Sequence, residues 1–103
     1  MSAKTFSDFN GDSKADILWR DPVTGSNAMW LMDGNTLSSP SFITSASTNW
    51  QVQGTGDFNG DSKADILWRD PATGSNAMWL MDGNTLSSPS FITSASTNWQ
   101  VVG

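Results

Sequence analysis

The chain consists of two nearly identical copies of one sequence unit. Residues 8–54 align without gaps on residues 57–103, and the two segments differ at only two pairs of positions, Val23 against Ala72 and Gln53 against Val102. Self-similarity at a fixed period is the signature of a repeat architecture, in which each unit buries its apolar surface against its neighbours. Ordinary divergence would leave more differences, so we interpret the duplication as recent or engineered.

The composition favours strands joined by tight turns. All acidic residues are aspartate, and the chain has no glutamate, cysteine or histidine. Glutamate supports helices, whereas Asp, Asn, Ser and Gly support turns. Without cysteine, neither a disulfide nor a thiolate metal site can form. Without histidine, the usual general base near neutral pH is missing, so we expect no enzymatic activity.

The charge of the chain restricts its partners. The formal net charge is −5 at pH 7, and the five Lys and Arg residues form no basic cluster in the sequence. This balance argues against a nucleic acid partner and favours cations or neutral ligands. No apolar run approaches the roughly 18 residues of a membrane-spanning helix, so we expect no membrane insertion.

Each unit predicts four short strands. In the second unit they are expected at residues 50–56, 65–69, 76–81 and 85–93. Residues 70–74, where Pro follows Asp and Gly comes three residues later, and the pair Asp82-Gly83 are typical of hairpin turns. Pro89 in the last strand suits an exposed sheet edge.

The segment 28–32, Ala-Met-Trp-Leu-Met, is apolar at every position rather than at alternate ones. Such a strand predicts a sheet that is covered on both faces, as in stacked β-propeller blades. The offset of 49 residues between the units also suits a blade of four strands. The predicted fold class is therefore all-β, with two four-stranded propeller blades. A small sandwich of two sheets is the alternative.

The two ends of the chain do not match. Residues 1–53 are predicted to form a first blade that lacks the start of its inner strand, because nothing before Asp8 resembles residues 50–54. Residues 54–103 are predicted to form the second blade, and residues 99–103 are a surplus copy of the inner strand. We expect this strand to complete the first blade of a neighbouring copy, which predicts a closed homo-oligomeric ring. A tetramer with eight blades is favoured over a trimer with six.

An aspartate-rich loop occurs once in each unit, at residues 8–16 and 57–65. Oxygen-bearing side chains fall at loop positions 1, 3, 5 and 9, and the main-chain carbonyl at position 7 adds another oxygen, a pattern typical of Ca²⁺ sites. The predicted ligands are Asp8, Asn10, Asp12, Lys14 and Asp16, and Asp57, Asn59, Asp61, Lys63 and Asp65. The alternative is a set of turns in which Asp and Asn cap their own backbone without metal.

Position 6 of each loop is Ser13 or Ser62, where such loops prefer glycine for the sharp turn. If the turn requires positive φ, serine costs about 1 kcal/mol there.

These motifs carry a family resemblance. Asp-Phe-Asn-Gly-Asp, Ala-Asp-Ile-Leu-Trp-Arg, Thr-Gly and Trp-Leu-Met-Asp-Gly resemble repeats of the FG-GAP/VCBS type, in particular those of the Psathyrella velutina lectin-like propeller group. The resemblance implies a propeller with Ca²⁺ in the loops between first and second strands. In the lectin branch it also implies sugar pockets between adjacent blades, with N-acetylglucosamine as the first ligand to test, and an extracellular location.

The end of each unit opposite the aspartate loop offers groups that suit a sugar. A sugar pocket needs an aromatic ring face and fixed amide, carboxylate or guanidinium partners for hydroxyl groups. The candidates are Arg20, Asp21, Asn27, Asn49 and Trp50, and their repeats Arg69, Asp70, Asn76, Asn98 and Trp99. Structural roles are the alternative, since propeller tryptophans fill the space between blades and Arg20 can pair with a neighbouring Asp. The sequence therefore predicts a calcium-stabilised, carbohydrate-binding module or, alternatively, a symmetric scaffold without a ligand.

Overall fold

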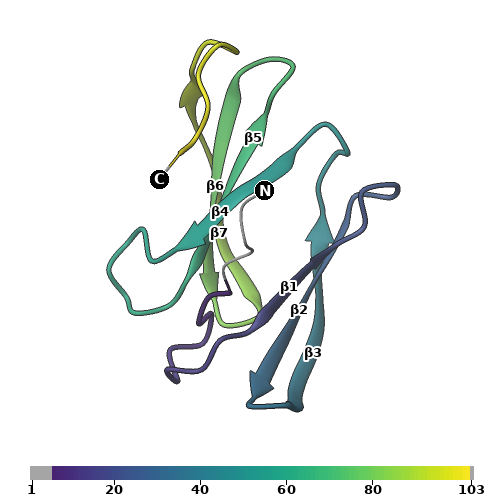
Figure 1. Cartoon of the computed structure of the whole chain (residues 1–103), viewed down its shortest axis with the longest axis vertical. Coiled ribbons are helices and arrows are strands. Elements are labelled where there is room, and N and C mark those ends of the chain that lie inside the picture. The colour runs from purple at the N-terminus through teal and green to yellow at the C-terminus, as the bar shows by residue number, and fades with distance from the viewer. Residues whose placement is uncertain (1–5, 103) are drawn as a thin grey trace.

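The computed structural model describes residues 6–102, which form seven strands in two antiparallel sheets and no helix (Figure 1). The first sheet has the order β1-β2-β3, with β1 at Ile17–Arg20, β2 at Ser26–Asp33 and β3 at Thr36–Ser45. The second sheet has the order β4-β5-β6-β7, with β4 at Gln51–Gly56, β5 at Asp65–Asp70, β6 at Ser75–Asp82 and β7 at Thr85–Ser94. In the part of the chain that the structure describes, no helix is long and apolar enough to cross a membrane.

The predicted strand positions agree with these bounds to within one residue at each end. The turns are also where the sequence placed them. In the hairpin between β1 and β2, the amide of Gly25 donates to the carbonyl of Asp21 at 2.8 Å, and Gly25 has a φ of 81°. A Cβ atom at Gly25 would lie 2.2 Å from the carbonyl oxygen of Ala46, so only glycine fits this close approach.

Successive residues of a strand point to opposite faces of the sheet. Each sheet has two apolar faces, because apolar residues occur at both the odd and the even positions of its strands. We call one the tryptophan face, formed in the second sheet by Ile66, Trp68, Trp79 and Met81 and in the first sheet by Ile17, Trp19, Trp30 and Met32. We call the other the leucine face, formed in the first sheet by Leu18, Met29, Leu31 and Ile43 and in the second sheet by Leu67, Met78, Leu80 and Ile92.

The core of the described residues lies where the leucine face of the first sheet packs on the tryptophan face of the second. Met29, Ile66 and Trp68 are fully buried there, together with Phe9 from the first aspartate loop. Within residues 6–102, no sheet covers the outward tryptophan face of the first sheet, and the outward leucine face of the second lies beside the C-terminal segment only. The two-sided apolar strands are therefore covered by another sheet on the inner side only.

The second sheet has four strands and the first has three. Within residues 6–102, an isolated bridge between Ser7 and Asp16 is all that remains of an inner strand in the first sheet. Lys4 and Thr5, which precede this bridge, lie outside the described residues. The predicted boundary between residues 53 and 54 lies inside β4, and all of β4 pairs with β5 in the second sheet.

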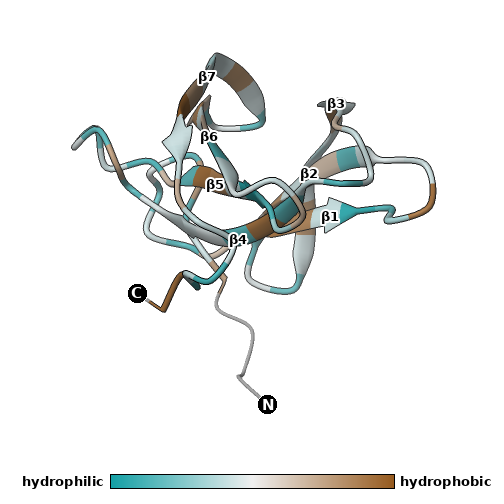
Figure 2. Ribbon diagram, turned by 90° about the horizontal axis from the view of Figure 1, so that it is seen from above, coloured by the Kyte–Doolittle hydropathy of each residue, from teal (hydrophilic) through white to brown (hydrophobic). Residues whose placement is uncertain are grey.

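The C-terminal segment after β7 forms no strand as far as Val102. It stays beside its own sheet because the guanidinium of Arg69 donates to the carbonyl of Trp99 at 3.1 Å. Arg20 makes the same bond to Trp50, just before β4 begins. The last visible segment is hydrophobic (Figure 2), and Val102 is almost fully exposed. The segment thus follows β7 in the way that residues 46–50 follow β3. Unlike β4, however, it pairs with no sheet.

Candidate functional site

The two aspartate loops bring their carboxylates together. One carboxylate oxygen each from Asp8, Asp12 and Asp16 lies within 4.8 Å of the others, and the same holds for Asp57, Asp61 and Asp65. Three like charges at this separation repel one another, and the repulsion is relieved when a cation lies between them. Both clusters are at the same end of the molecule. The first cluster lies just before β1, and the second lies where β5 begins.

The first aspartate of each loop organises the loop backbone. The Asp8 carboxylate accepts the amides of Gly11 at 2.8 Å and Ser13 at 2.7 Å, and Asp12 donates at 3.2 Å. Ser13 has a φ of 67° and Ser62 a φ of 68°, which confirms the left-handed turn expected at position 6. In the second loop, amides led by that of Ser62 bind the Asp57 carboxylate and lower the pKa of Asp57.

The last aspartate of each loop is buried and ties the loop to the sheet. Asp16 accepts the amide of Phe9 at 2.8 Å and that of Met32, in β2, at 2.9 Å. Asp65 repeats this arrangement with Phe58 at 3.0 Å and Met81 at 2.8 Å. A buried carboxylate is stable only when it is hydrogen-bonded or paired, and these amides satisfy part of each group. The loop ends are therefore fixed before any ligand binds.

The donor set fits a hard divalent cation. Carboxylate, amide and carbonyl oxygens are the ligands that Ca²⁺ takes, and the loops offer no nitrogen or sulfur ligand. The ammonium group of Lys14 does not fill the cluster, because it binds the Asp33 carboxylate at 2.7 Å. This partner raises the pKa of Lys14. Lys63 and Asp82 repeat the pair at 2.6 Å. The side chains of Asp8, Asn10, Asp12 and Asp16 and the carbonyl of Lys14 would hold the ion, as would the matching groups of the second loop.

At the opposite end, Arg20 and Arg69 are structural clamps. The Arg20 guanidinium donates to the Asn27 side chain at 3.0 Å and to four main-chain carbonyls, those of Gly25, Ala46, Ser47 and Trp50, at 2.8–3.1 Å. Arg69 makes the same five contacts with the equivalent groups. The alternative of an Arg20–Asp pair is wrong: within residues 6–102 neither arginine forms a salt bridge.

The other candidate ligand groups near these arginines are also engaged. The side-chain oxygen of Asn27 accepts a hydrogen bond from Arg20, and its side-chain nitrogen donates to the carbonyl of Thr44 at 2.8 Å. Asn76 makes the same two bonds with Arg69 and Thr93. Asp21 caps its own hairpin, where the amides of Val23 and Thr24 lower the pKa of Asp21. Asp70 caps the second hairpin through Ala72. These side chains hold the turn between strands and offer little free hydrogen-bonding capacity.

Asn49, Asn98, Trp50 and Trp99 have freer side chains. The amides of Asn49 and Asn98 bind the hydroxyls of Ser47 and Ser96, while both side chains are exposed. Trp50 is half-buried at the junction between the sheets, and Trp99 is exposed. The structure therefore brings Arg20, Asn27 and the main chain of Trp50 together, but it leaves the side chain of Asn49 outside this group.

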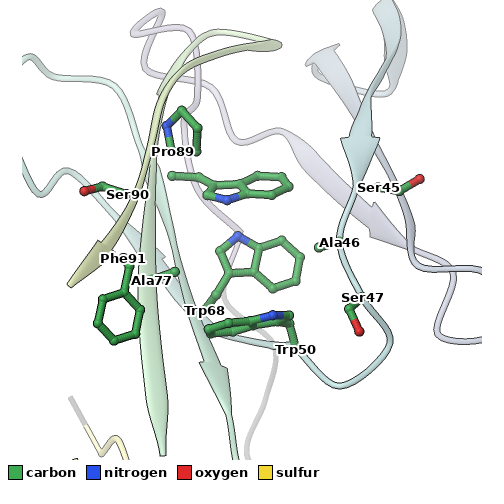
Figure 3. Close-up of a pocket in the computed structure, with 10 residues that line it drawn as sticks. Ser45, Ala46, Ser47, Trp50, Trp68, Ala77, Pro89, Ser90 and Phe91 are labelled. Carbon is green, nitrogen blue, oxygen red and sulfur yellow. The ribbon is translucent and has the colours of Figure 1, made fainter. Parts of the chain in front are cut away.

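A pocket of about 340 Å³ opens between the two sheets (Figure 3). One wall is formed by the end of β3 and its connection to β4, with Ser45, Ala46, Ser47 and Trp50. The second sheet forms the other wall, with Trp68, Ala77, Trp79, Pro89 and Phe91 on its tryptophan face and Ser90, whose hydroxyl points away from the indole rings (Figure 3). Sequence reasoning found only Trp50 of this set. The serines could not be found from the sequence, because nothing distinguishes them from the other serines of β3 and β7.

The cation–π contact behind this pocket joins the two sheets. The Arg20 guanidinium lies 4.8 Å from the ring centroid of Trp68, and Trp68 packs at a tilt on Trp79 at 4.8 Å between ring centroids. The indole Nε1 of Trp68 is buried and has no hydrogen-bond partner among the described residues. Contact with the Arg20 charge and the neighbouring ring compensates part of that cost.

Comparison with protein families gives one finding for this chain. A family model described as an FG-GAP-like repeat matches residues 8–68, which run from the first aspartate loop to β5. Comparisons with curated proteins and with solved structures found no match.

Proposed function

Because the chain belongs to the FG-GAP-like repeat family, we propose that it is a pair of β-propeller blades that closes with other copies into a ring. In this proposal the aspartate loops hold Ca²⁺, and the junctions between blades bind simple carbohydrates. The chain has no catalytic role, since its carboxylates serve the cation loops, the hairpin turns and two surface ion pairs.

One observation carries the ring: the open face of the first sheet has the same residues as the buried face of the second. Trp68 is 1% exposed, whereas its equivalent Trp19 is 47% exposed. The partner that would cover Trp19 is a leucine face, and within the described residues no sheet packs on the leucine face of the second sheet. A second copy therefore supplies the missing surface. Contacts of this head-to-tail kind form rings when the rotation closes.

The free C-terminal segment fits the same assembly. Residues 99–101 repeat residues 50–52, which lead into β4, and the first sheet lacks the strand that β4 supplies to the second. Adding this segment to the neighbouring first sheet would complete its ladder beyond the Ser7–Asp16 bridge. Each chain contributes two blades, so the ring contains an even number. We favour eight blades, in a tetramer, over six, in a trimer.

Native mass spectrometry and sedimentation velocity test the ring. We expect one discrete oligomer and no stable folded monomer at micromolar concentration. Deleting residues 99–103 should abolish the discrete species. A monodisperse, folded monomer at that concentration would contradict the proposal.

The pocket between the sheets supports carbohydrate binding. It is of the size that small ligands occupy, and the indole rings of Trp50, Trp68 and Trp79 lie in its walls. Since Arg20 and Asn27 are engaged elsewhere, we assign sugar binding to ring stacking on Trp50 and, at the junction between copies, on its equivalent Trp99. Each site is shallow and weak. Many sites on one rigid ring bind a dense glycan surface more tightly through effective concentration.

A glycan array with the intact ring and Ca²⁺ tests this part, with N-acetylglucosamine as the first ligand. The double variant Trp50→Leu and Trp99→Leu should weaken binding, because it removes the ring face at the two kinds of junction and keeps an apolar side chain there. The control pair, Ser38→Ala and Ser87→Ala, changes exposed serines of β3 and β7 away from the pocket. No binding to any glycan by a closed ring would leave the alternative, a symmetric scaffold.

A further inference from the structure

The first aspartate loop is bonded to the second sheet through its main chain. The amide of Ala64 donates to the carbonyl of Asp8 at 2.8 Å, and the amide of Gly83 donates to the carbonyl of Phe9 at 3.0 Å. Figure 1 shows this loop beside the turn between β6 and β7, which contains Gly83. The loop is thus part of the seam between the two sheets.

The side chain of Phe9 closes the same seam. Phe9 is 1% exposed and belongs to the core, whereas its equivalent Phe58 is 53% exposed. The local structure of the two residues is the same, since each amide donates to the last aspartate of its loop. The difference in burial arises because a sheet lies beside the first loop and none lies beside the second.

Phe9 stands between two cation-ligand candidates in the sequence, Asp8 and Asn10. The carbonyl of Asp8 is bonded to the second sheet while its carboxylate belongs to the acidic cluster. A ligand that holds the Asp8 carboxylate in place therefore also restrains the Asp8 carbonyl, which accepts the hydrogen bond from the second sheet. A bound cation removes the repulsion among the three carboxylates and so holds residues 8–10 in the conformation that contacts the neighbouring sheet.

The open side of the first sheet has the complementary groups for the second loop. Ala64 and Gly83, which receive the first loop, are buried, and their equivalents Ala15 and Gly34 are exposed. By the repeat, the carbonyls of Asp57 and Phe58 in one copy match the amides of Ala15 and Gly34 in the next. Phe58 then takes the place against that sheet that Phe9 has against the second sheet.

From these contacts we infer that the loop 57–65 is a cation-dependent clasp between copies. A hard divalent cation held by this loop orders Phe58 and the Asp57 carbonyl for docking, so the cation at that site strengthens ring closure. The inference rests on the proposed ring. Because linkage is reciprocal, assembly must also raise the affinity of this loop for the cation by the same factor.

Sedimentation velocity over a protein dilution series tests the clasp, with Ca²⁺ in excess or with chelator. Chelation should raise the protein concentration needed for half-assembly by a factor of about 5 to 150, the usual range for coupled sites. Asp61→Ala should have the same effect in the presence of Ca²⁺, because it removes one exposed carboxylate from the second cluster. Asp21→Asn is the control: it removes one exposed charge at the opposite end of the molecule.

Phe58→Ala separates the clasp from simple loss of folding. It keeps every cation ligand, so calorimetry should still detect Ca²⁺ binding to both loops while assembly is weakened. A far-UV circular dichroism spectrum like that of the wild type verifies that each variant is folded. If the wild type assembles equally with and without the cation, or if Phe58→Ala assembles like the wild type, the clasp is wrong and the ring stands. If no oligomer forms under any condition, the proposed ring itself is wrong.

Discussion

The two sheets have the same sequence and different surroundings. Trp68 and Trp79 are buried in the second sheet and their equivalents Trp19 and Trp30 are exposed in the first, while the loop phenylalanine is buried in the first repeat and exposed in the second. Burial here is a property of position in a stack rather than of the residue. In the middle of the chain, the leucine face of the first sheet packs on the tryptophan face of the second. The first sheet exposes a second tryptophan face, and the second sheet has a second leucine face that no sheet covers. This complementarity is the strongest argument for association.

Features within a sheet are the same in both repeats. The arginine clamps, the hairpin turns, the left-handed serines and the lysine–aspartate pairs occur twice with distances that agree closely. Apart from the inner strand β4, which only the second sheet has, the main differences are in the contacts between sheets. Variants of equivalent residues can therefore separate the two kinds of contact within one molecule.

The largest difference is expected for tryptophan. Trp68→Ala should lower the free energy of unfolding by about 3–5 kcal/mol, because it leaves a cavity in the core. Trp19→Ala should cost far less in dilute, dissociated chains and approach the cost of Trp68→Ala once the chains assemble. Urea denaturation over a dilution series measures both. Equal costs at the lowest concentration would mean that Trp19 is covered within a single chain.

Removal of the cation should have the next largest effect. A ligand that binds only the folded state stabilises it by about 2.7 kcal/mol at a hundredfold excess over its Kd. The melting temperature in Ca²⁺ should therefore be higher than the melting temperature in chelator. The double variant Asp12→Ala and Asp61→Ala should remove this difference. In dissociated chains Asp12→Ala alone should be the more harmful single change, since its loop contacts both sheets. Identical melting with and without chelator would refute the metal site.

The left-handed serines give a smaller effect, equal in the two loops. Ser13→Gly and Ser62→Gly relieve a conformation that costs a non-glycine residue about 1 kcal/mol. Calorimetric titration should show tighter Ca²⁺ binding in the double variant, because the loop reaches its binding conformation more easily. Weaker or unchanged binding would show that serine makes a compensating contact.

The smallest effect on stability is expected when low pH protonates Asp33 and breaks the Lys14–Asp33 pair. Lys14 lowers the pKa of Asp33 below its ordinary value of 3.8. The pair therefore stabilises the fold above that value and loses its contribution as the pH falls through the lowered pKa. Because both groups are largely exposed, the loss should be slight. NMR titration of the Asp33 carboxyl in the wild type and in Lys14→Ala measures it; equal values in both would contradict the pairing.

Local sequence determined the strands, the turns and the loop conformation. Asp-Gly and Asp-Pro segments specify hairpins through short-range sterics, and the repeat of Asp and Asn specifies a loop that wraps its own amides. The positive φ at Ser13 could be predicted because the loop pattern prefers glycine there. Interactions over a few residues decide all of these, so a single sequence suffices to predict them.

Tertiary structure alone decided what the shared residues do. Arg20 and Asn27 have the chemistry of a sugar site, yet carbonyls from residues 25–50, which are distant in sequence, occupy them. The pocket serines became visible only when two sheets met. No sequence pattern could predict that Trp68 is buried while Trp19 is exposed, because the two residues have nearly identical neighbours along the chain. Only the presence of an adjacent sheet distinguishes them, and that depends on the position of each repeat in the stack.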